Sequence, residues 1–160
     1  MKSMNSNVFE IKPIGVIRTP YKDKSKAPHQ GCFSKDICEI EVFREYEEGL
    51  KDIEACTHLI ILYWLDRAKR DALIAIPPHD GKKHGVFATR SPNRPNPIAF
   101  AVVELVERDA NVLRVRGIDA LNKTPLIDIK PYSSEIDAVS NARIGWFEEA
   151  KRSRCHVQLR

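Results

Sequence analysis

The chain of 160 residues has no long hydrophobic run, since its longest apolar stretch, residues 59–65, is far too short to cross a bilayer. Its first seven residues are polar and lack the apolar segment of a secretory signal peptide. These two absences predict a soluble cytoplasmic protein that is not associated with a membrane.

The sequence also lacks the spacings that are typical of metal, redox and dinucleotide sites. Its four cysteines form no CxxC pair, and its five histidines form no HExxH motif. We therefore expect no metal site, and we expect buried or idle thiols. Neither GxGxxG nor GxxxxGK[ST] is present, and strands and helices do not alternate as in a Rossmann fold. The lack of histidine ligand spacing also disfavours a metal-dependent hydrolase.

The charge balance is mildly basic, with a formal net charge of +4. Such a balance permits contact with a polyanion such as RNA but does not require it. The basic run at residues 151–154 is typical of a solvated tail more often than of a nucleic-acid anchor. With 42% hydrophobic residues, the chain is long enough to form one domain with a proper core.

Short apolar runs separated by turn residues predict a strand-rich fold. Residues 37–43 alternate in polarity, which predicts a half-buried strand, whereas the continuous apolar run at residues 58–65 predicts a strand buried on both faces. Residues 98–106 and 112–118 flank a polar segment and predict a hairpin. The other expected elements are a helix over residues 45–55, short extended runs over 14–18, 71–76, 85–88 and 126–129, and weaker elements over 136–139 and 144–147.

Together these elements predict a mainly β fold, an antiparallel barrel or sandwich with short helical additions. No internal repeat is present. We expect residues 1–8 to form a flexible leader, residues 9–140 to form the β-barrel domain, and residues 141–160 to form a C-terminal extension.

The most informative segment is residues 85–98, which read GVFATRSPNRPNPI. Its three closely spaced prolines exclude a helix and a central strand, because each fixes φ and removes a backbone donor. A stiff loop that presents the guanidinium groups of Arg90 and Arg94 is pre-organised to bind a carboxylate or a phosphate. A proline-rich surface turn with solvated arginines is the alternative.

A second segment, residues 117–132, reads GIDALNKTPLIDIKPY. If it is extended near its end, Asp128 and Lys130 lie on one face of a strand. Such an arrangement is either part of a site or an exposed ion pair that stabilises the fold by at most about 1 kcal/mol. Asp119 lies at the end of a strand, where it either contributes to a site or caps a turn.

With these two segments in this order, the chain resembles the TsaA-like family, whose characterised bacterial members are TrmO-type enzymes. The resemblance runs over residues 14–132 and includes IGVIRTPYK, PHQG and THLIIL. TrmO-type enzymes use S-adenosylmethionine to methylate N6 of threonylcarbamoyladenosine at position 37 of certain tRNAs. The resemblance implies a small antiparallel β-barrel that forms a homodimer and binds this cofactor near the dimer interface, with tRNA as the substrate.

Carried over residue by residue, the resemblance also implies which side chains contact the cofactor. Arg90 is the expected ligand of the methionine carboxylate, and Phe100 is the expected apolar contact to the adenine or ribose. The full set of implied cofactor-binding residues is Pro28, His29, Gln30, Asp66, Arg67, Arg90, Phe100, Gly117, Ile118 and Asp119.

The chain departs from the usual pattern of this family near the implied site. His29 replaces an arginine, and Asn122-Lys123 replaces a typical Asp-Gly. The loss of one arginine and one carboxylate concerns the substrate more than the cofactor, so a different acceptor stays open. The remaining departures are Ala99 in place of a glycine, and Cys56 and Ile60 in place of aromatic residues.

The implied reaction is a direct displacement at the sulfonium methyl group by the exocyclic nitrogen of a modified adenine. Positioning of this nitrogen and removal of its proton then matter most. Asp119 and Asp128 are weak candidates for the base, His58 and His84 are also available, and substrate-assisted proton loss is equally open. A histidine beside an apolar strand is, however, more often a core residue than a catalytic one.

Two other functions stay open. One is a protein that binds S-adenosylmethionine but acts on a different substrate. The other is a non-catalytic RNA-binding barrel, which requires exposed aromatic side chains among lysines and arginines. Tyr21, Phe43, Tyr63 and Trp64 are scattered or lie in apolar runs, so no such platform is visible in the sequence.

Overall fold

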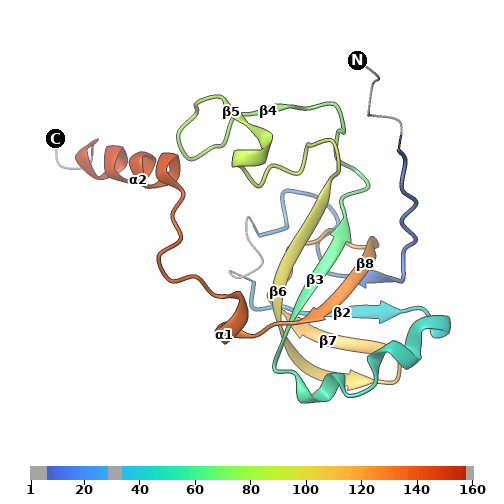
Figure 1. The fold of residues 1–160 in the computed structure, drawn as a ribbon. Helices are drawn as coiled ribbons and strands as arrows, with labels where there is room; N and C mark the ends of the chain where they lie inside the picture. The colour runs from blue at the N-terminus through green and yellow to red at the C-terminus, as the bar shows by residue number, and fades with distance from the viewer. Residues whose placement is uncertain (1–6, 29–33, 158–160) are drawn as a thin grey trace. The chain divides into compact units, whose positions relative to one another are not determined.

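A computed structural model of the protein describes residues 7–28 and 34–157, with side chains described up to residue 152 (Figure 1). The chain divides into two compact units. The first, here called the barrel unit, comprises Met1–Trp64 and Ala99–Tyr132. The second unit comprises Leu65–Ile98 and Ser133–Arg160. The expected boundary at residue 140, between a β-barrel domain and a C-terminal extension, stays a prediction.

The barrel unit is a closed antiparallel barrel with the strand order β1-β2-β7-β6-β3-β8. This arrangement confirms the mainly β barrel expected from the sequence. The longest of these strands, β6, forms a hairpin with β7, in which Asp109 pairs with Val112 across the turn, so the predicted hairpin is confirmed. The strands are β1 (Gly15–Arg18), β2 (Ile37–Val42), β3 (His58–Trp64), β6 (Ile98–Asp109), β7 (Val112–Arg116) and β8 (Thr124–Pro131).

The core of the barrel is made by alternate residues of each strand. In β3, Leu59, Ile61 and Tyr63 are buried, whereas Ile60 and Leu62 are only partly buried. The prediction that this strand is buried on both faces was therefore wrong, because only one face of a barrel strand points to the interior. Further core side chains with no exposed surface are Ile17, Ile40, Val103, Leu113, Val115, Ile118 and Leu126.

The single helix predicted over residues 45–55 is two short 3-10 helices, η2 (Arg44–Leu50) and η3 (Ile53–Ala55). Asp52 separates them, with a left-handed backbone at φ 66° that no helix can contain. Leu50 nevertheless points inward, with 3% of its surface exposed. The sequence thus predicted helical structure in this segment correctly but not the type or the continuity of the helix.

The thiol of Cys38 is buried in the barrel, and burial together with nearby Asp36 raises its pKa to about 11. The thiol is therefore protonated near neutral pH and unreactive, as the sequence predicted for an idle cysteine. Cys56 is also a free thiol and is partly exposed.

The second unit contains a two-stranded sheet of β4 (Ile74–Ala75) and β5 (His84–Gly85), followed by the 3-10 helix η4 (Val86–Ala88). The prediction of a strand over residues 85–88 was thus wrong beyond Gly85. Near the C-terminus lie α1 (Ser134–Asp137) and α2 (Gly145–Val157), where the sequence predicted only weak elements. Within residues 7–28 and 34–157, no helix is long and apolar enough to cross a membrane.

Closure of the barrel at β1 predicts a strict requirement for glycine at position 15. A Cβ atom there would lie 2.2 Å from the carbonyl oxygen of Glu41 on the paired strand β2. We expect Gly15→Ala to lower the free energy of unfolding by about 2 kcal/mol or more, because the backbones must separate. Urea denaturation measures this loss.

The matched control for this prediction is Gly49→Ala in η2. A Cβ atom at that position would meet no heavy atom within 4 Å, so stability should stay the same or rise slightly. Equal denaturation midpoints for the two variants would contradict the proposed close approach.

Candidate functional site

The cofactor-binding residues expected from the sequence lie in both units of the chain. Pro28, Phe100 and the turn at residues 117–119 belong to the barrel unit, and Asp66, Arg67 and Arg90 belong to the second unit. His29 and Gln30 lie outside the described residues. Phe100 is on β6 with 45% of its surface exposed, and Pro28 is partly buried.

In the barrel unit, the turn after β7 is held tightly. Gly117 has φ 103°, a conformation that favours glycine, and Ile118 is completely buried. The hydroxyl of Thr19 donates to the carbonyl of Ala120 at 2.8 Å. The turn therefore places Asp119 at a fixed point of the barrel.

Asp119 is further held by Tyr63, whose hydroxyl donates to the Asp119 carboxylate. Burial, and then the nearby charge of Asp119, raises the pKa of Tyr63 above its usual value near 10. The tyrosine thus remains a proton donor, and the carboxylate has capacity for further hydrogen bonds from an amine, a hydroxyl or an ammonium group.

Tyr63 was missed as a site residue, because the sequence places it in an apolar run. The sequence nevertheless contains one indication that Tyr63 has a polar partner. A tyrosine on the inward-facing side of a strand needs a partner for its hydroxyl, although the sequence does not say which partner that is.

Asp128, the other weak candidate for a catalytic base, has different surroundings on β8. It forms an ion pair with Lys130 at 2.7 Å, and its side chain is 40% exposed. Its Oδ1 also accepts a hydrogen bond from the backbone amide of Ile129 at 2.9 Å. Asp128 and Lys130 thus form the exposed ion pair that the sequence offered as the simpler interpretation.

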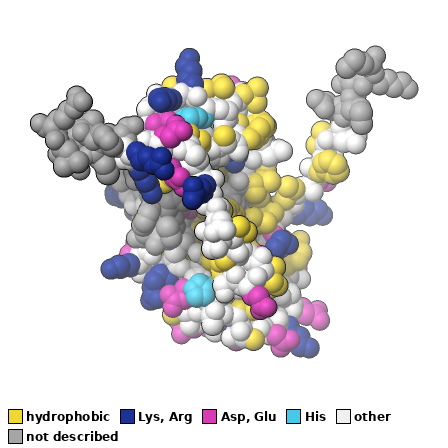
Figure 2. Space-filling view, turned by 60° about the vertical axis from the view of Figure 1, so that its left-hand side comes forward, with side chains coloured by type: hydrophobic (Ala, Val, Ile, Leu, Met, Phe, Trp, Pro, Cys, Tyr) yellow, Lys and Arg dark blue, Asp and Glu magenta, His cyan; other side chains and the backbone are white. Residues whose placement is uncertain are grey.

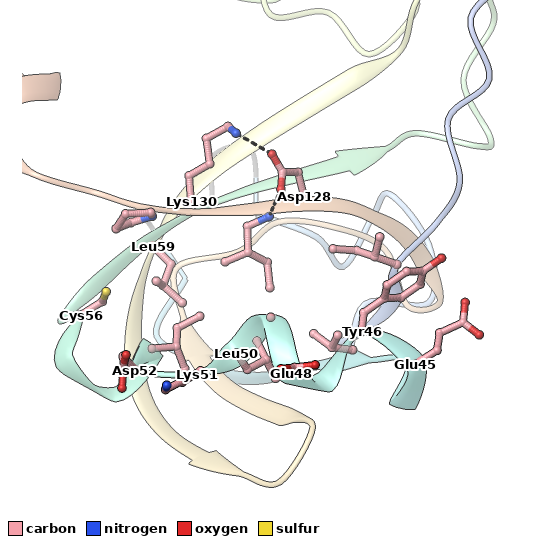
Figure 3. Close-up of a pocket in the computed structure, with 16 residues that line it drawn as sticks. Glu45, Tyr46, Glu48, Leu50, Lys51, Asp52, Cys56, Leu59, Asp128 and Lys130 are labelled. Atoms are coloured by element: carbon pink, nitrogen blue, oxygen red, sulfur yellow. Dashed lines mark hydrogen bonds and ion pairs between the residues drawn. The ribbon is translucent and has the colours of Figure 1, made fainter.

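Asp128 lines a cavity of about 560 Å³ in the barrel unit, between β8 and the 3-10 helices η2 and η3 (Figure 3). Its lining includes the apolar side chains of Leu50 and Leu59 and the acidic side chains of Glu48 and Asp52. None of the eight described residues that were expected to bind the cofactor lines this cavity. It is therefore separate from the turn that carries Asp119.

In the second unit, backbone and side-chain hydrogen bonds join the segment containing Asp66 and Arg67 to the segment containing Arg90. The amide of Leu65 donates to the carbonyl of Pro97 at 2.8 Å, and the amide of Arg94 donates to the carbonyl of Lys69 at 3.1 Å. The two segments that carry these three predicted residues are thus hydrogen-bonded to each other. A further bond between them runs from the Lys69 amide to Oδ1 of Asn93, at 3.0 Å.

Arg94 has a structural role in the segment that contains Arg90. Its Nη2 donates to the carbonyl of Thr89 at 2.7 Å and also to the carbonyl of Val86. The sequence predicted a loop that presents two guanidinium groups, but Arg94 turns inward and braces the turn that precedes Arg90. Arg90 is the exposed arginine of the segment.

The two histidines considered as bases have other partners. His84 is partly buried, lies 2.9 Å from Oδ2 of Asp80, and stacks on Trp146 of α2 with ring centroids 4.5 Å apart. His58 is exposed, and its Nδ1 lies 3.0 Å from the hydroxyl of Thr57. Among the described residues, no group of three or more His, Cys, Asp or Glu side chains is arranged to hold a metal ion.

Comparison with known families matches residues 16–138 to the model described as the tRNA-methyltransferase O N-terminal domain. A curated relative from Archaeoglobus fulgidus, named a probable S-adenosyl-L-methionine-binding protein, is 71% identical over 89% of this chain. The match covers 39% of that relative, so the chain spans less than half of its length. A second protein from the same organism, named an S-adenosyl-L-methionine-binding protein, is 52% identical over 81% of this chain and 94% of its own length.

The tRNA (adenine(37)-N6)-methyltransferase of Escherichia coli is 34% identical over 94% of this chain and 69% of its own length. Among solved structures, a crystal structure of TrmO from Pseudomonas aeruginosa is similar with a TM-score of 0.71 and 33% identity. The similarity covers 87% of this chain and 62% of that one.

The contact between Tyr63 and Asp119 predicts a measurable coupling. In a double-mutant cycle with Tyr63→Phe and Asp119→Asn, we expect a coupling energy of about 1.5 kcal/mol, as for a hydrogen bond to a charged group. Denaturation of the parent and the three variants measures it. A coupling near zero would contradict the contact.

The same pair predicts how stability changes at high pH. Folding raises the pKa of Tyr63 above the value near 10 that it has in the unfolded chain. The stability that its protonated hydroxyl contributes is therefore fully present below pH 10. It is lost as the pH rises above that value. The parent should therefore lose stability above pH 10 more steeply than Tyr63→Phe, and parallel curves would contradict this expectation.

Proposed function

Because the chain belongs to the family of tRNA-methyltransferase O N-terminal domains, we propose that it binds S-adenosylmethionine and catalyses transfer of the methyl group to an adenine of tRNA. The acceptor we propose is N6 of threonylcarbamoyladenosine at position 37. The observation that carries this proposal is the match of 34% identity over 94% of the chain to the Escherichia coli tRNA (adenine(37)-N6)-methyltransferase.

The described residues fit the chemistry of this cofactor. Its carboxylate needs a cationic donor, and Arg90 is an exposed guanidinium on a braced turn. Its ammonium group needs an acceptor, and Asp119 is a carboxylate held in place by the Tyr63 hydroxyl. Its adenine needs an apolar surface, which the partly exposed ring of Phe100 provides. We propose these three roles as separate assignments, each of which can be tested alone.

We propose that the protein contributes less to the chemical step itself than to binding and positioning the reactants. When bound, the cofactor supplies an electrophilic methyl group. The protein positions the attacking nitrogen, which is the larger demand for such a displacement. Asp119 is a poor base while it accepts the hydrogen bond from the Tyr63 hydroxyl and pairs with an ammonium group, and Asp128 is paired with Lys130. We therefore assign the removal of the proton to the substrate or to solvent.

A second candidate function is binding of the same cofactor with a different acceptor. The relatives with 71% and 52% identity are named only as S-adenosyl-L-methionine-binding proteins. Departures of the chain from the family pattern at His29 and Lys123 also favour this alternative. Under either function we propose that the protein acts as a homodimer, as the family resemblance implies.

The first experiment is isothermal titration of the purified protein with S-adenosylmethionine and with S-adenosylhomocysteine. Binding in the micromolar range is expected. Labelled methyl transfer to tRNA that carries threonylcarbamoyladenosine, compared with tRNA that lacks it, then separates the two candidate functions. Binding without transfer to either tRNA would favour the different acceptor, and no binding would contradict both.

Arg90→Ala tests the assignment of the cofactor carboxylate. Loss of a charged hydrogen bond should weaken cofactor binding about tenfold, corresponding to roughly 1.5 kcal/mol. The matched control is Arg44→Ala, an exposed arginine of the barrel unit that pairs with Glu47. It should leave the dissociation constant unchanged. An unchanged dissociation constant in Arg90→Ala would remove Arg90 from the site.

A further inference from the structure

Phe87 in the second unit is an exposed aromatic residue at the centre of a short, well-braced turn. In η4, 80% of its surface is exposed, whereas the preceding Val86 is 1% exposed. A large aromatic ring with so little burial contributes almost nothing to folding. The fold therefore does not explain why a phenylalanine occupies this position.

Hydrogen bonds fix the turn on both sides of this ring. The amide of Val86 donates to the carbonyl of Leu73 at 3.0 Å, and Nε1 of Trp146 donates to the carbonyl of Ala88 at 3.0 Å. The carbonyl of Val86 accepts from the guanidinium of Arg94 and from the hydroxyl of Thr89. The ring is thus held outward by its backbone, which lowers the entropic cost of binding a partner.

The surroundings of Phe87 in the sequence are strongly basic. The barrel unit is nearly balanced, with 14 Lys and Arg and 15 Asp and Glu. In contrast, residues 65–98 contain seven Lys and Arg but only three Asp and Glu. Six of the seven are exposed: Arg67, Lys69, Arg70, Lys82, Lys83 and Arg90. Figure 2 shows one face of the molecule, on which basic and hydrophobic side chains are both at the surface.

We propose that Phe87 stacks on an unpaired base of an RNA substrate, while Lys82 and Lys83 contact its phosphates. An exposed ring among cations is the usual way in which proteins hold single-stranded nucleotides in RNA loops. This inference rests on the proposed function, since it assigns the RNA-contacting surface of that enzyme. It also supplies an exposed aromatic residue four and five positions from two exposed lysines, which was not among the aromatic residues considered from the sequence.

A second copy of the chain is the other partner to consider, because Leu73, Ile74 and Ile76 are also more than half exposed. Lysine is depleted at protein interfaces, whereas Lys82 and Lys83 lie close to Phe87 in the sequence. The charge of the segment therefore favours RNA. The aliphatic residues give a control, because burial in a dimer would involve them but stacking on a base would not.

The test measures binding of a fluorescent RNA hairpin with an unpaired adenine-containing loop by anisotropy, at two salt concentrations. Phe87→Ala should weaken binding about tenfold, and Phe87→Trp should retain it, because stacking needs a flat ring. Leu73→Ala should bind RNA like the parent. Replacing Lys82 and Lys83 by alanine should make binding less dependent on salt.

Titration with S-adenosylmethionine and sedimentation of each variant complete the experiment. Unchanged cofactor affinity and an unchanged mass in Phe87→Ala, together with weaker RNA binding, support the inference. Parent-like RNA binding in Phe87→Ala overturns it, as does absence of RNA binding by the parent. If sedimentation shows a lower molecular mass for both Phe87→Ala and Leu73→Ala than for the parent, a dimer has been lost. That result also overturns the inference, in favour of a contact between copies.

The binding assay needs no methyl transfer, so it separates this inference from the proposed function. RNA binding that depends on Phe87, without methylation of any tRNA, contradicts the proposed function and leaves the stacking contact intact. Methylation of tRNA by Phe87→Ala with an unchanged KM for tRNA contradicts only the stacking contact.

Discussion

The barrel depends on the four-residue strand β1, which closes it by pairing with β2 on one side and β8 on the other. The close approach of the backbone at Gly15 to Glu41 makes this closure possible. The same strand supports the candidate site. The amide of Lys123 donates to the carbonyl of Ile17 at 2.8 Å, and the amide of Thr19 donates to the side chain of Asn122 at 3.1 Å. The turn that carries Asp119 is thus fixed by the strand that closes the barrel.

In the second unit, the guanidinium of Arg94 has a comparable role. It bridges two carbonyl groups, and within the described part of the chain its buried Nε has no hydrogen-bond partner. An unpaired buried donor is costly, and such groups persist where the surrounding structure requires the geometry. Here the geometry holds the turn between Phe87 and Arg90, where an exposed ring and an exposed cation lie three residues apart.

The sequence predicted those features that depend on local patterns. Alternating polarity located β2, and the polar break after β6 located its hairpin with β7. Patterns failed where distant residues decide the structure. Helix α2 was predicted only as a weak element, because its aromatic residues lie only at its start. There Trp146 stacks on His84, which is distant in the chain. Tyr63 and Asp119 are 56 positions apart in the chain, and no pattern within either segment pairs them. Arg90 and Asp119 were singled out from their own segments as possible site residues, but their roles toward the cofactor came only from the family resemblance.

The departures at Asn122 and Lys123 can be interpreted from the structure. The side-chain oxygen of Asn122 accepts a hydrogen bond from the Thr19 amide, which an aspartate oxygen accepts equally well. Lys123 has φ 68°, where a lysine costs about 1 kcal/mol more than the glycine typical of the family. The turn therefore keeps its bracing and accepts a conformational cost, while it loses a negative charge and gains an exposed positive one. The change thus alters the charge beside Asp119 without altering the bracing of its turn, so under the proposed function it bears on the acceptor rather than on cofactor binding.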